Sequence, residues 1–569
     1  MKLVQAIVII GALAMASVGC VGNLGDGAAG PSGSGRPGGP NNPGNPNNPR
    51  PNEPVPACPD GDELGPRVVR RLTASELETT IRTVFSLDAS AWSGPTTPPD
   101  AASGDGFTGD VDRLRVNETY ASRLLETGRA VADVVSAQPR LSTMLPCATA
   151  GDEACARNFV TTYARRLYRR APTDAELNRY LEAYRRIVPA AGFPAWVRAA
   201  TIAMVQSPHV VWRSELGTVS GDGVAQLAGW EIATELAYTY TGAPPDDALL
   251  SRAERGELDD PAVVRDVARS MVLDDAGAVR PAFRRIALRF FEQWASLSSL
   301  PNITKDVELY PGFTPAVRDA MRRELDAYFD HVILEERGGV AELLTSPSTY
   351  VDATLASYYG FGAASGGDMI AAERPEGWGI GLLAQGGWLS VQANAEITSP
   401  TRRGHFIRDR LLCQEIPPPP PTVGPLPEVD VGSVSTRERY EVLHASNESC
   451  NSCHRLMDPI GFGFEHLDAA GRRRETEGRF EIDDSGRLTN VSAGDIEFEG
   501  AEAIAAHLAE LPEVEGCIAT WVARHAYAID RHDAACMAAS ARPELEQDGG
   551  SFVDHWIALA GTAHFTSRR

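Results

Sequence analysis

Basic residues are scarce in this sequence. Its 53 Lys and Arg residues are outnumbered by 76 Asp and Glu residues, which gives a formal net charge of −23 at pH 7. Because an acidic surface repels the phosphate backbone of nucleic acids, we expect no nucleic-acid partner. Long apolar runs are also missing beyond residue 20. Since a membrane-spanning helix needs about 18–20 apolar residues, we expect that the body of the chain does not span a membrane.

Aromatic residues are a modest 7% of the chain, but 43% of its residues are hydrophobic, which is typical of a globular protein. The 569 residues are too many for one compact core. At about 100–200 residues per domain, the length predicts roughly three to five modules.

Helical patterns dominate the body of the chain. Capping boxes at Thr73–Glu76 and Thr173–Glu176 each precede apolar residues at helical spacing. Strand signals are few, and the clearest is residues 479–483, followed by a turn, with residues 496–498 as a possible partner. The sequence therefore predicts a mainly α, multi-module protein with one small β-hairpin in its C-terminal part.

The first 65 residues predict export and a tether. Residues 1–20 combine Lys2 with an apolar stretch that ends in small residues before Cys20, as in a signal peptide. The ending resembles a bacterial lipobox, so Cys20 is the predicted site of lipidation; ordinary secretion with cleavage nearby is the alternative. Residues 21–65 are rich in Gly, Pro and Asn and predict a linker without a core. We expect a lipid-anchored protein of the cell envelope, facing the periplasm or on the outer-membrane surface.

Export also decides how the nine cysteines are interpreted, because disulfides form and persist in oxidising compartments. Two pairs lie close together in the sequence and are predicted to form local disulfides. These pairs are Cys147–Cys155 and Cys517–Cys536, which leaves Cys58 and Cys413 either to pair with each other or to stay reduced.

The motif that carries chemistry is C-x-x-C-H at residues 450–454. This spacing is typical of c-type haem attachment, in which two thiols add to the haem vinyl groups and the adjacent imidazole binds the iron. The sequence therefore predicts one covalent haem c, bound through Cys450 and Cys453, with His454 as the proximal metal ligand. A zinc site would need a second Cys or His pair nearby, and a redox dithiol would need a strand–helix setting. A plain disulfide within the motif is the third alternative.

The second axial position of such an iron is open at this point. Met457 is too close to His454 along the helix to reach the opposite face. An iron with five ligands is also possible. The other candidates have no diagnostic spacing; they are Met537, His466, His507, His525 and His532.

Several stretches resemble one protein family. They include RRLTASELETTIRTVF, WEIATELAYTYTGAPPDDALL, SPTRRGHFIRDRLLCQEIPPPPP and SCNSCHRLMDPIGFGFEHLDAAGRRR. These stretches are similar to the large secreted, cytochrome-c-like proteins of planctomycetes and myxobacteria, which are assembled from planctomycete-secreted-domain and planctomycete-cytochrome modules. The resemblance supports Cys450, Cys453 and His454 as haem groups and implies no established reaction.

The resemblance extends over nearly all of residues 66–569, in the usual order of the modules. We expect a signal peptide at 1–20, a linker at 21–65 and then five modules. Their expected bounds are 66–137, 145–217, 224–362, 376–477 for the cytochrome-like module with the CxxCH motif, and 478–569.

Three functions are compatible with these features. The first is an electron-transfer lipoprotein whose haem exchanges electrons with another redox protein of the envelope. The second is an enzyme, which would be a haem oxidoreductase. The third is a structural surface protein in which the CxxCH motif is only a disulfide. With one CxxCH motif and no paired catalytic carboxylates, the sequence favours the electron carrier.

The lipobox interpretation makes a prediction about membrane attachment. Substituting Cys20→Ser removes the thiol that would carry the acyl chains, so the protein should move from the membrane fraction to the soluble envelope fraction. Immunoblotting of the two fractions measures this. A variant that stays with the membranes to the same extent as the wild type would contradict the anchor.

Overall fold

The computed structural model describes residues 64–569 apart from 95, 112, 222, 363, 418–431, 445–447 and 549. The predicted signal peptide, Cys20, most of the linker and Cys58 lie outside the described residues. The chain is 59% helical with 8% in strands, which confirms the predicted mainly α fold. No helix within the described residues is both long and apolar enough to cross a bilayer.

The N-terminal third forms a helical group with its own hydrophobic core. Both predicted capping boxes are present, and each places a Thr hydroxyl and a Glu carboxylate on the free backbone N–H groups of a helix start. The core includes Phe85, Phe159 and Trp196, all of which are buried. The elements are β1 (Val68–Arg71), α2 (Ala74–Phe85), α3 (Glu118–Ser136), α4 (Arg140–Met144), η1 (Pro146–Thr149), α5 (Glu153–Tyr168), α6 (Asp174–Ala191), α7 (Phe193–Val205), α8 (Pro208–Val211) and β2 (Trp212–Glu215).

A second, larger core begins with the central helices. Trp294, Phe290 and Phe291 of one helix lie at its centre and are fully buried. The central elements are β3 (Thr218–Val219), β4 (Ala225–Gln226), α9 (Gly229–Thr241), α10 (Asp247–Glu254), η2 (Glu257–Asp259), α11 (Pro261–Val272), α12 (Pro281–Trp294), η3 (Leu297–Asn302), α13 (Pro315–Tyr328), η4 (Phe329–Glu335), α14 (Val340–Thr345), β5 (Ser348–Val351), α15 (Ala353–Tyr359), β6 (Ile370–Glu373), η5 (Leu382–Ala384) and α16 (Gly386–Val391).

The C-terminal part shares this second core instead of forming one of its own. Its elements are α17 (Pro400–Phe406), η6 (Ile407–Leu411), α18 (Thr436–Glu438), η7 (Arg439–His444), α19 (Glu448–Gly461), η8 (Phe462–Phe464), β7 (Thr476–Glu477), β8 (Phe480–Glu481), β9 (Ser485–Leu488), β10 (Ile496–Glu499), α20 (Gly500–Glu510), α21 (Pro512–Tyr527), α22 (Arg531–Asp548), α23 (Phe552–Ala560), α24 (Ala563–Thr566) and β11 (Ser567–Arg568).

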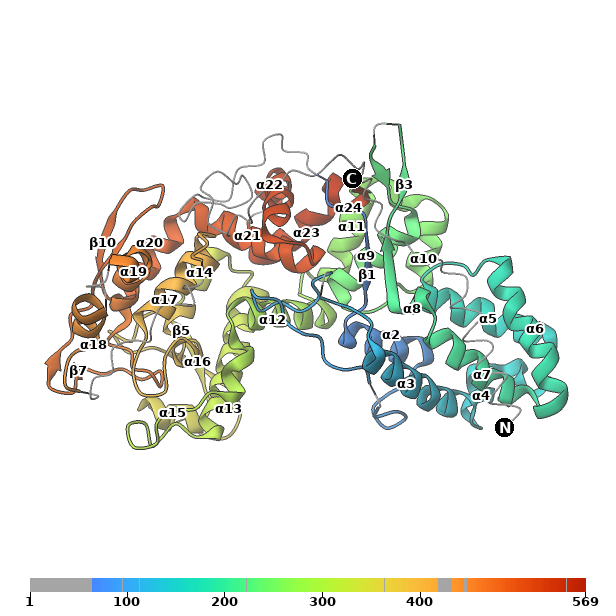
Figure 1. Cartoon of the computed structure of the whole chain (residues 1–569), viewed down its shortest axis with the longest axis horizontal. Helices are drawn as coiled ribbons and strands as arrows, with labels where there is room; N and C mark the ends of the chain where they lie inside the picture. The colour runs from blue at the N-terminus through green and yellow to red at the C-terminus, as the bar shows by residue number, and fades with distance from the viewer. Residues whose placement is uncertain are drawn as a thin grey trace, which may run out of the picture.

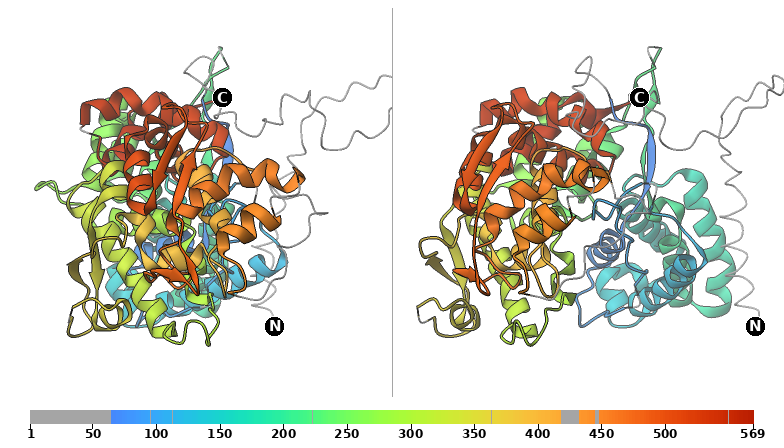
Figure 2. Two further views of the ribbon diagram at one scale, coloured as in Figure 1. Left: turned by 90° about the vertical axis from the view of Figure 1, so that its left-hand side faces the viewer. Right: turned by 60° about the vertical axis from the view of Figure 1, so that its left-hand side comes forward.

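The two groups of helices lie at opposite ends of the molecule. In Figure 1, α3–α7 occupy one end and α13–α20 the other, with α21–α23 lying along the top between them. Both views in Figure 2 show the C-terminal helices, in red, against the central helices, in green, where α23 packs on α11. The CxxCH helix α19 lies at the end remote from the N-terminal group.

Buried ion pairs connect the two cores. Arg70 of β1 donates to Glu235 of α9 at 3.0 Å, and its guanidinium also lies 3.2 Å from Glu215 of β2. Arg568, the penultimate residue, donates to the same Glu215 at 2.7 Å. Because buried charges are costly unless they are paired, these pairs fix how the N-terminal group, α9 and the C-terminal strand meet.

The predicted hairpin is placed differently in the structure. Residues 496–499 (β10) pair with 485–488 (β9), and 480–481 (β8) pair with 476–477 (β7). The expected partnership of 479–483 with 496–498 is therefore wrong. The reason is a close contact: Phe498 lies opposite Gly486, where any Cβ would overlap its ring. Gly486, which the sequence places in a turn, is therefore part of strand β9.

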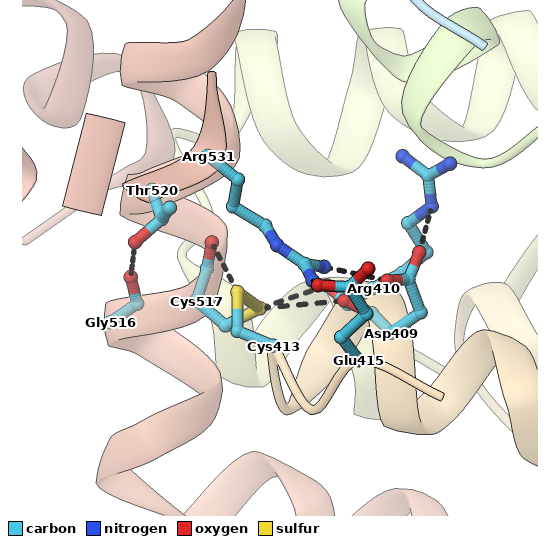
Figure 3. The surroundings of a disulfide bond; sticks show 8 residues. All are labelled: Asp409, Arg410, Cys413, Glu415, Gly516, Cys517, Thr520 and Arg531. Carbon is cyan, nitrogen blue, oxygen red and sulfur yellow. Dashed lines mark hydrogen bonds and ion pairs between the residues drawn. A yellow bond between two sulfur atoms is a disulfide. The ribbon is translucent and has the colours of Figure 1, made fainter. Parts of the chain in front are cut away.

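The disulfides confirm one predicted pair and correct the other. Cys147 and Cys155 are bonded as predicted. Cys517 bonds to Cys413, so the predicted Cys517–Cys536 pair is wrong; Cys536 is disulfide-bonded, but not to Cys517. Figure 3 shows why: Cys517 of α21 faces the segment after η6, and Arg531 binds Asp409 and Glu415 beside it. Cys517 bonds to a distant cysteine and not to Cys536, which is near in sequence, because α21 packs across η6.

Removing the disulfide that closes the longer loop should lower the free energy of unfolding more than removing the other. The sequence separations are 104 for Cys413–Cys517 and 8 for Cys147–Cys155. From the entropy of the unfolded chain alone, we expect losses of about 4.7 and about 2.5 kcal/mol. Calorimetry of the double Cys→Ala variants should show the larger fall in Tm for Cys413/Cys517. Peptide mapping without reductant provides the control, and a peptide that links Cys517 to Cys536 would refute the assignment.

Candidate functional site

The CxxCH motif lies in the first turns of α19. Cys450 and Cys453 are three residues apart on this helix, so their side chains lie on the same face. Both are partly exposed. Of the seven cysteines in the described part of the chain, these two carry free thiols, while the other five are disulfide-bonded. The motif thus presents an accessible, reduced thiol pair next to His454.

Two glycines allow α17 to lie directly on α19. A Cβ at Gly404 would overlap the carbonyl oxygen of Met457, and a Cβ at Gly461 would overlap that of Pro400. The two backbones are therefore in contact at two points, where no larger residue is possible without a shift. This contact brings Thr401 of α17 beside the motif.

His454 is held by a carboxylate from the next turn of its own helix. Its Nδ1 lies 2.8 Å from Oδ2 of Asp458, and the hydroxyl of Thr401 donates to Oδ1 of Asp458 at 2.7 Å. An ionised carboxylate accepts hydrogen bonds and cannot donate them, so the ring hydrogen of His454 belongs on Nδ1. Nε2 then keeps its lone pair, as a metal-binding histidine requires, and the carboxylate strengthens it as a donor to a metal.

Buried arginines of α17 and η6 fix the backbone of α19 and of the turn η8 that follows it. Arg403 donates to the backbone oxygen of Phe464 at 2.7 Å, and Arg408 donates to that of Leu456 at 2.9 Å. Burial lowers the pKa of each to about 10, which leaves both charged at neutral pH. Because these are charge-assisted bonds to main-chain oxygens, they hold the backbone on both sides of Asp458 in place.

A second histidine faces His454. His444, at the end of the π-helical turn η7, is buried, and its Nε2 lies 3.1 Å from Nε2 of His454. The two ring centres are 4.4 Å apart and the rings are inclined at 73°. Burial and the neighbouring His454 lower the pKa of His444, so its imidazole is neutral at pH 7. Sequence analysis missed this residue, which precedes His454 by ten positions in a stretch with no recognisable motif.

Three of the predicted distal ligands, His466, His525 and Met537, make their contacts elsewhere in the fold. His466 donates from Nδ1 to the backbone oxygen of Arg474 at 2.9 Å. His525 lies among the rings of Phe107, Phe290 and Trp556. Met537 is buried in the second core, within the helical region around α21 and α22.

The residues around the motif fit a c-type haem in the chemistry of their donors. Two free thiols and an imidazole with an available Nε2 lone pair are the groups that such a haem needs. No cluster of three or more His, Cys, Asp and Glu side chains placed to hold a metal ion occurs in the described residues.

Three family models match the chain and together cover just over half of it. The model for a planctomycete secreted domain described as "Protein of unknown function (DUF1595)" matches residues 155–215, and a second, described as "Protein of unknown function (DUF1592)", matches residues 227–361. A planctomycete cytochrome-type model, "Protein of unknown function (DUF1588)", matches residues 380–477, which include α17, α19 and the CxxCH motif. No curated protein and no solved structure matches the chain.

Proposed function

This chain belongs to the family of large secreted proteins built from these planctomycete modules, and on that premise we propose that it is an envelope redox protein with one covalent haem c. Cys450 and Cys453 would form the thioether links, and His454 would bind the iron. The protein would be tethered by lipid at Cys20 and would pass electrons to or from another redox protein of the cell envelope.

The observation that carries this proposal is the state of the thiols. In a chain whose other described cysteines are oxidised, the CxxCH pair is reduced, partly exposed and next to an imidazole whose Nε2 lone pair is available. Thioether formation needs reduced thiols. A structural disulfide within the motif would have consumed them.

The chain's own residues then have defined tasks. Asp458 keeps the hydrogen of His454 on Nδ1, and Thr401 keeps the Asp458 carboxylate in position. A haem supplies a one-electron couple between ferrous and ferric iron. When a haem is bound, the Asp458 carboxylate would increase electron donation by His454, which would favour the oxidised state of the iron. Glycines 404 and 461 hold α17 and α19 together, so that this geometry does not depend on a flexible loop.

Covalent haem attachment is the direct test. The full-length protein, produced in a host with a c-type maturation system, should keep peroxidase activity in the gel after boiling in detergent. The Cys450→Ala/Cys453→Ala variant should lose this stain completely, because no covalent link is left. The matched control is Cys147→Ala/Cys155→Ala, which removes another cysteine pair and should keep the stain. A wild-type protein without covalent haem would refute the proposed function.

A further inference from the structure

We propose that His444 is the second axial ligand of the iron, opposite His454. This inference rests on the proposed function. It starts from one juxtaposition: two imidazoles from separate elements, η7 and α19, meet with their Nε2 atoms 3.1 Å apart.

The hydrogen bonding around His454 makes this meeting chemically specific. Because Asp458 takes the hydrogen on Nδ1, Nε2 of His454 keeps a lone pair beside Nε2 of His444. His444 is buried. Two imidazole nitrogens at this distance repel each other unless they share a proton or a metal cation. In the metal-free chain the Nε2 hydrogen of His444 fills this role, and a metal ion can replace it.

An iron between the two nitrogens requires the rings to separate and to turn. Metal–imidazole bonds are about 2.0–2.1 Å, so the two nitrogens, now 3.1 Å apart, must lie roughly 4 Å apart on opposite sides of the metal. The ring centres, now 4.4 Å apart, must separate further so that both Nε2 atoms point at the metal. His444 ends the short π-helical turn η7, in which the side chain of Val442 is 59% exposed, so a shift of the turn on that side does not break a buried apolar contact. His454, in contrast, is fixed through Asp458 to α17.

A second imidazole decides between carrier and enzyme. Activation of oxygen or peroxide at a haem needs a free coordination position, whereas electron transfer does not. With His444 bound, no position is left open. Binding of both histidines to the iron therefore favours an electron carrier over a haem oxidoreductase.

Spectroscopy of the haem-loaded, full-length protein tests His444. The wild type should be six-coordinate and low-spin in both oxidation states, and its ferrous form should bind carbon monoxide slowly. His444→Ala should keep the covalent haem stain but become high-spin, with at least tenfold faster carbon monoxide binding. Added imidazole should restore the low-spin spectrum of His444→Ala. His532→Ala, which removes an exposed histidine that sequence analysis named as a candidate, is the control and should match the wild type.

The outcomes separate the two proposals. A protein without covalent haem refutes the proposed function and, with it, this inference. A haem-loaded wild type that is high-spin, or a His444→Ala variant that stays low-spin with unchanged carbon monoxide binding, refutes the role of His444 alone.

A second inference is independent of the haem and concerns a cavity of about 200 Å³ where the two cores meet. Its walls come from β1 and α2, from β2, α9 and α12, and from the end of α21. We infer that it binds a small tetrahedral oxyanion such as sulfate or phosphate. The positively charged side chains that line it are Arg70, Arg71, Arg213, Arg285 and Arg289, and the carboxylate that lines it is that of Glu76.

The balance of charge in this cavity is positive. Arg70 and Arg71 are paired with carboxylates behind the wall, those of Glu235 and Asp100. Arg289 of α12 forms no hydrogen bond or ion pair with any residue in the described part of the chain, and Arg285 is bonded to a backbone oxygen alone.

The environment of Arg213 also favours an oxyanion as the ligand. It is 4% exposed, its Nε and Nη1 form no hydrogen bond within the described residues, and its nearest carboxylate oxygens are 3.8 and 3.9 Å away. Guanidinium groups bind oxyanions through paired N–H donors, and Arg213 has two such donors without a hydrogen-bond partner in the described residues. Four oxygens on one anion can use several of these donors at once, which chloride cannot.

Isothermal titration of the full-length protein with sulfate and phosphate, at constant ionic strength set with chloride, tests the cavity. We expect saturable binding of one anion per chain and at least tenfold weaker binding by Arg289→Gln. The control is Arg179→Gln on α6, an exposed arginine far from the cavity. Circular dichroism checks that Arg289→Gln is folded. No saturable binding by the wild type, or equal binding by Arg289→Gln, would overturn this inference.

Discussion

The contact between α17 and α19 is the constraint on which the candidate site depends. Gly404 and Gly461 let the two backbones touch, and any side chain at either position would overlap a carbonyl oxygen of the other helix. Through this contact Thr401 reaches Asp458, and Asp458 orients His454. The chemistry of the site thus rests on two residues that have no side chain. A substitution at either glycine would separate the helices and remove the Thr401 hydroxyl from the Asp458 carboxylate that orients His454.

The rest of the C-terminal part holds this pair of helices in the fold. Arg408 bonds to a main-chain oxygen within α19, and Arg403 bonds to one in η8, directly after it. The Cys413–Cys517 disulfide ties the end of η6 to α21, which belongs to the second core. The module that carries the CxxCH motif is therefore embedded in a shared core, in contrast to a domain carried on a linker. This arrangement limits relative motion, which suits a site whose two imidazoles come from different elements.

Charged side chains form the junction between the two cores. Arg70, Glu215, Glu235 and Arg568 form a buried network in which Glu235 has a pKa raised to about 7 by burial and by Glu215. Beside this network, the cavity leaves arginines without carboxylate partners. A buried guanidinium with unused donors, such as that of Arg213, is costly in a purely structural junction, which is why the cavity has the character of a binding site.

Local features of the sequence determined much of this protein. Capping boxes and apolar spacing predicted the helices, C-x-x-C-H marked the two free thiols and the adjacent His454, and eight-residue spacing predicted Cys147–Cys155, because each of these depends on residues a few positions apart. Tertiary structure alone decided the rest. His444 meets His454 because η7 turns back over α19, Cys517 meets Cys413 across 104 residues, and the arginine cavity draws its walls from three distant segments. Contacts between such distant residues depend on how the helices pack against one another, and short-range patterns in the sequence do not determine this packing.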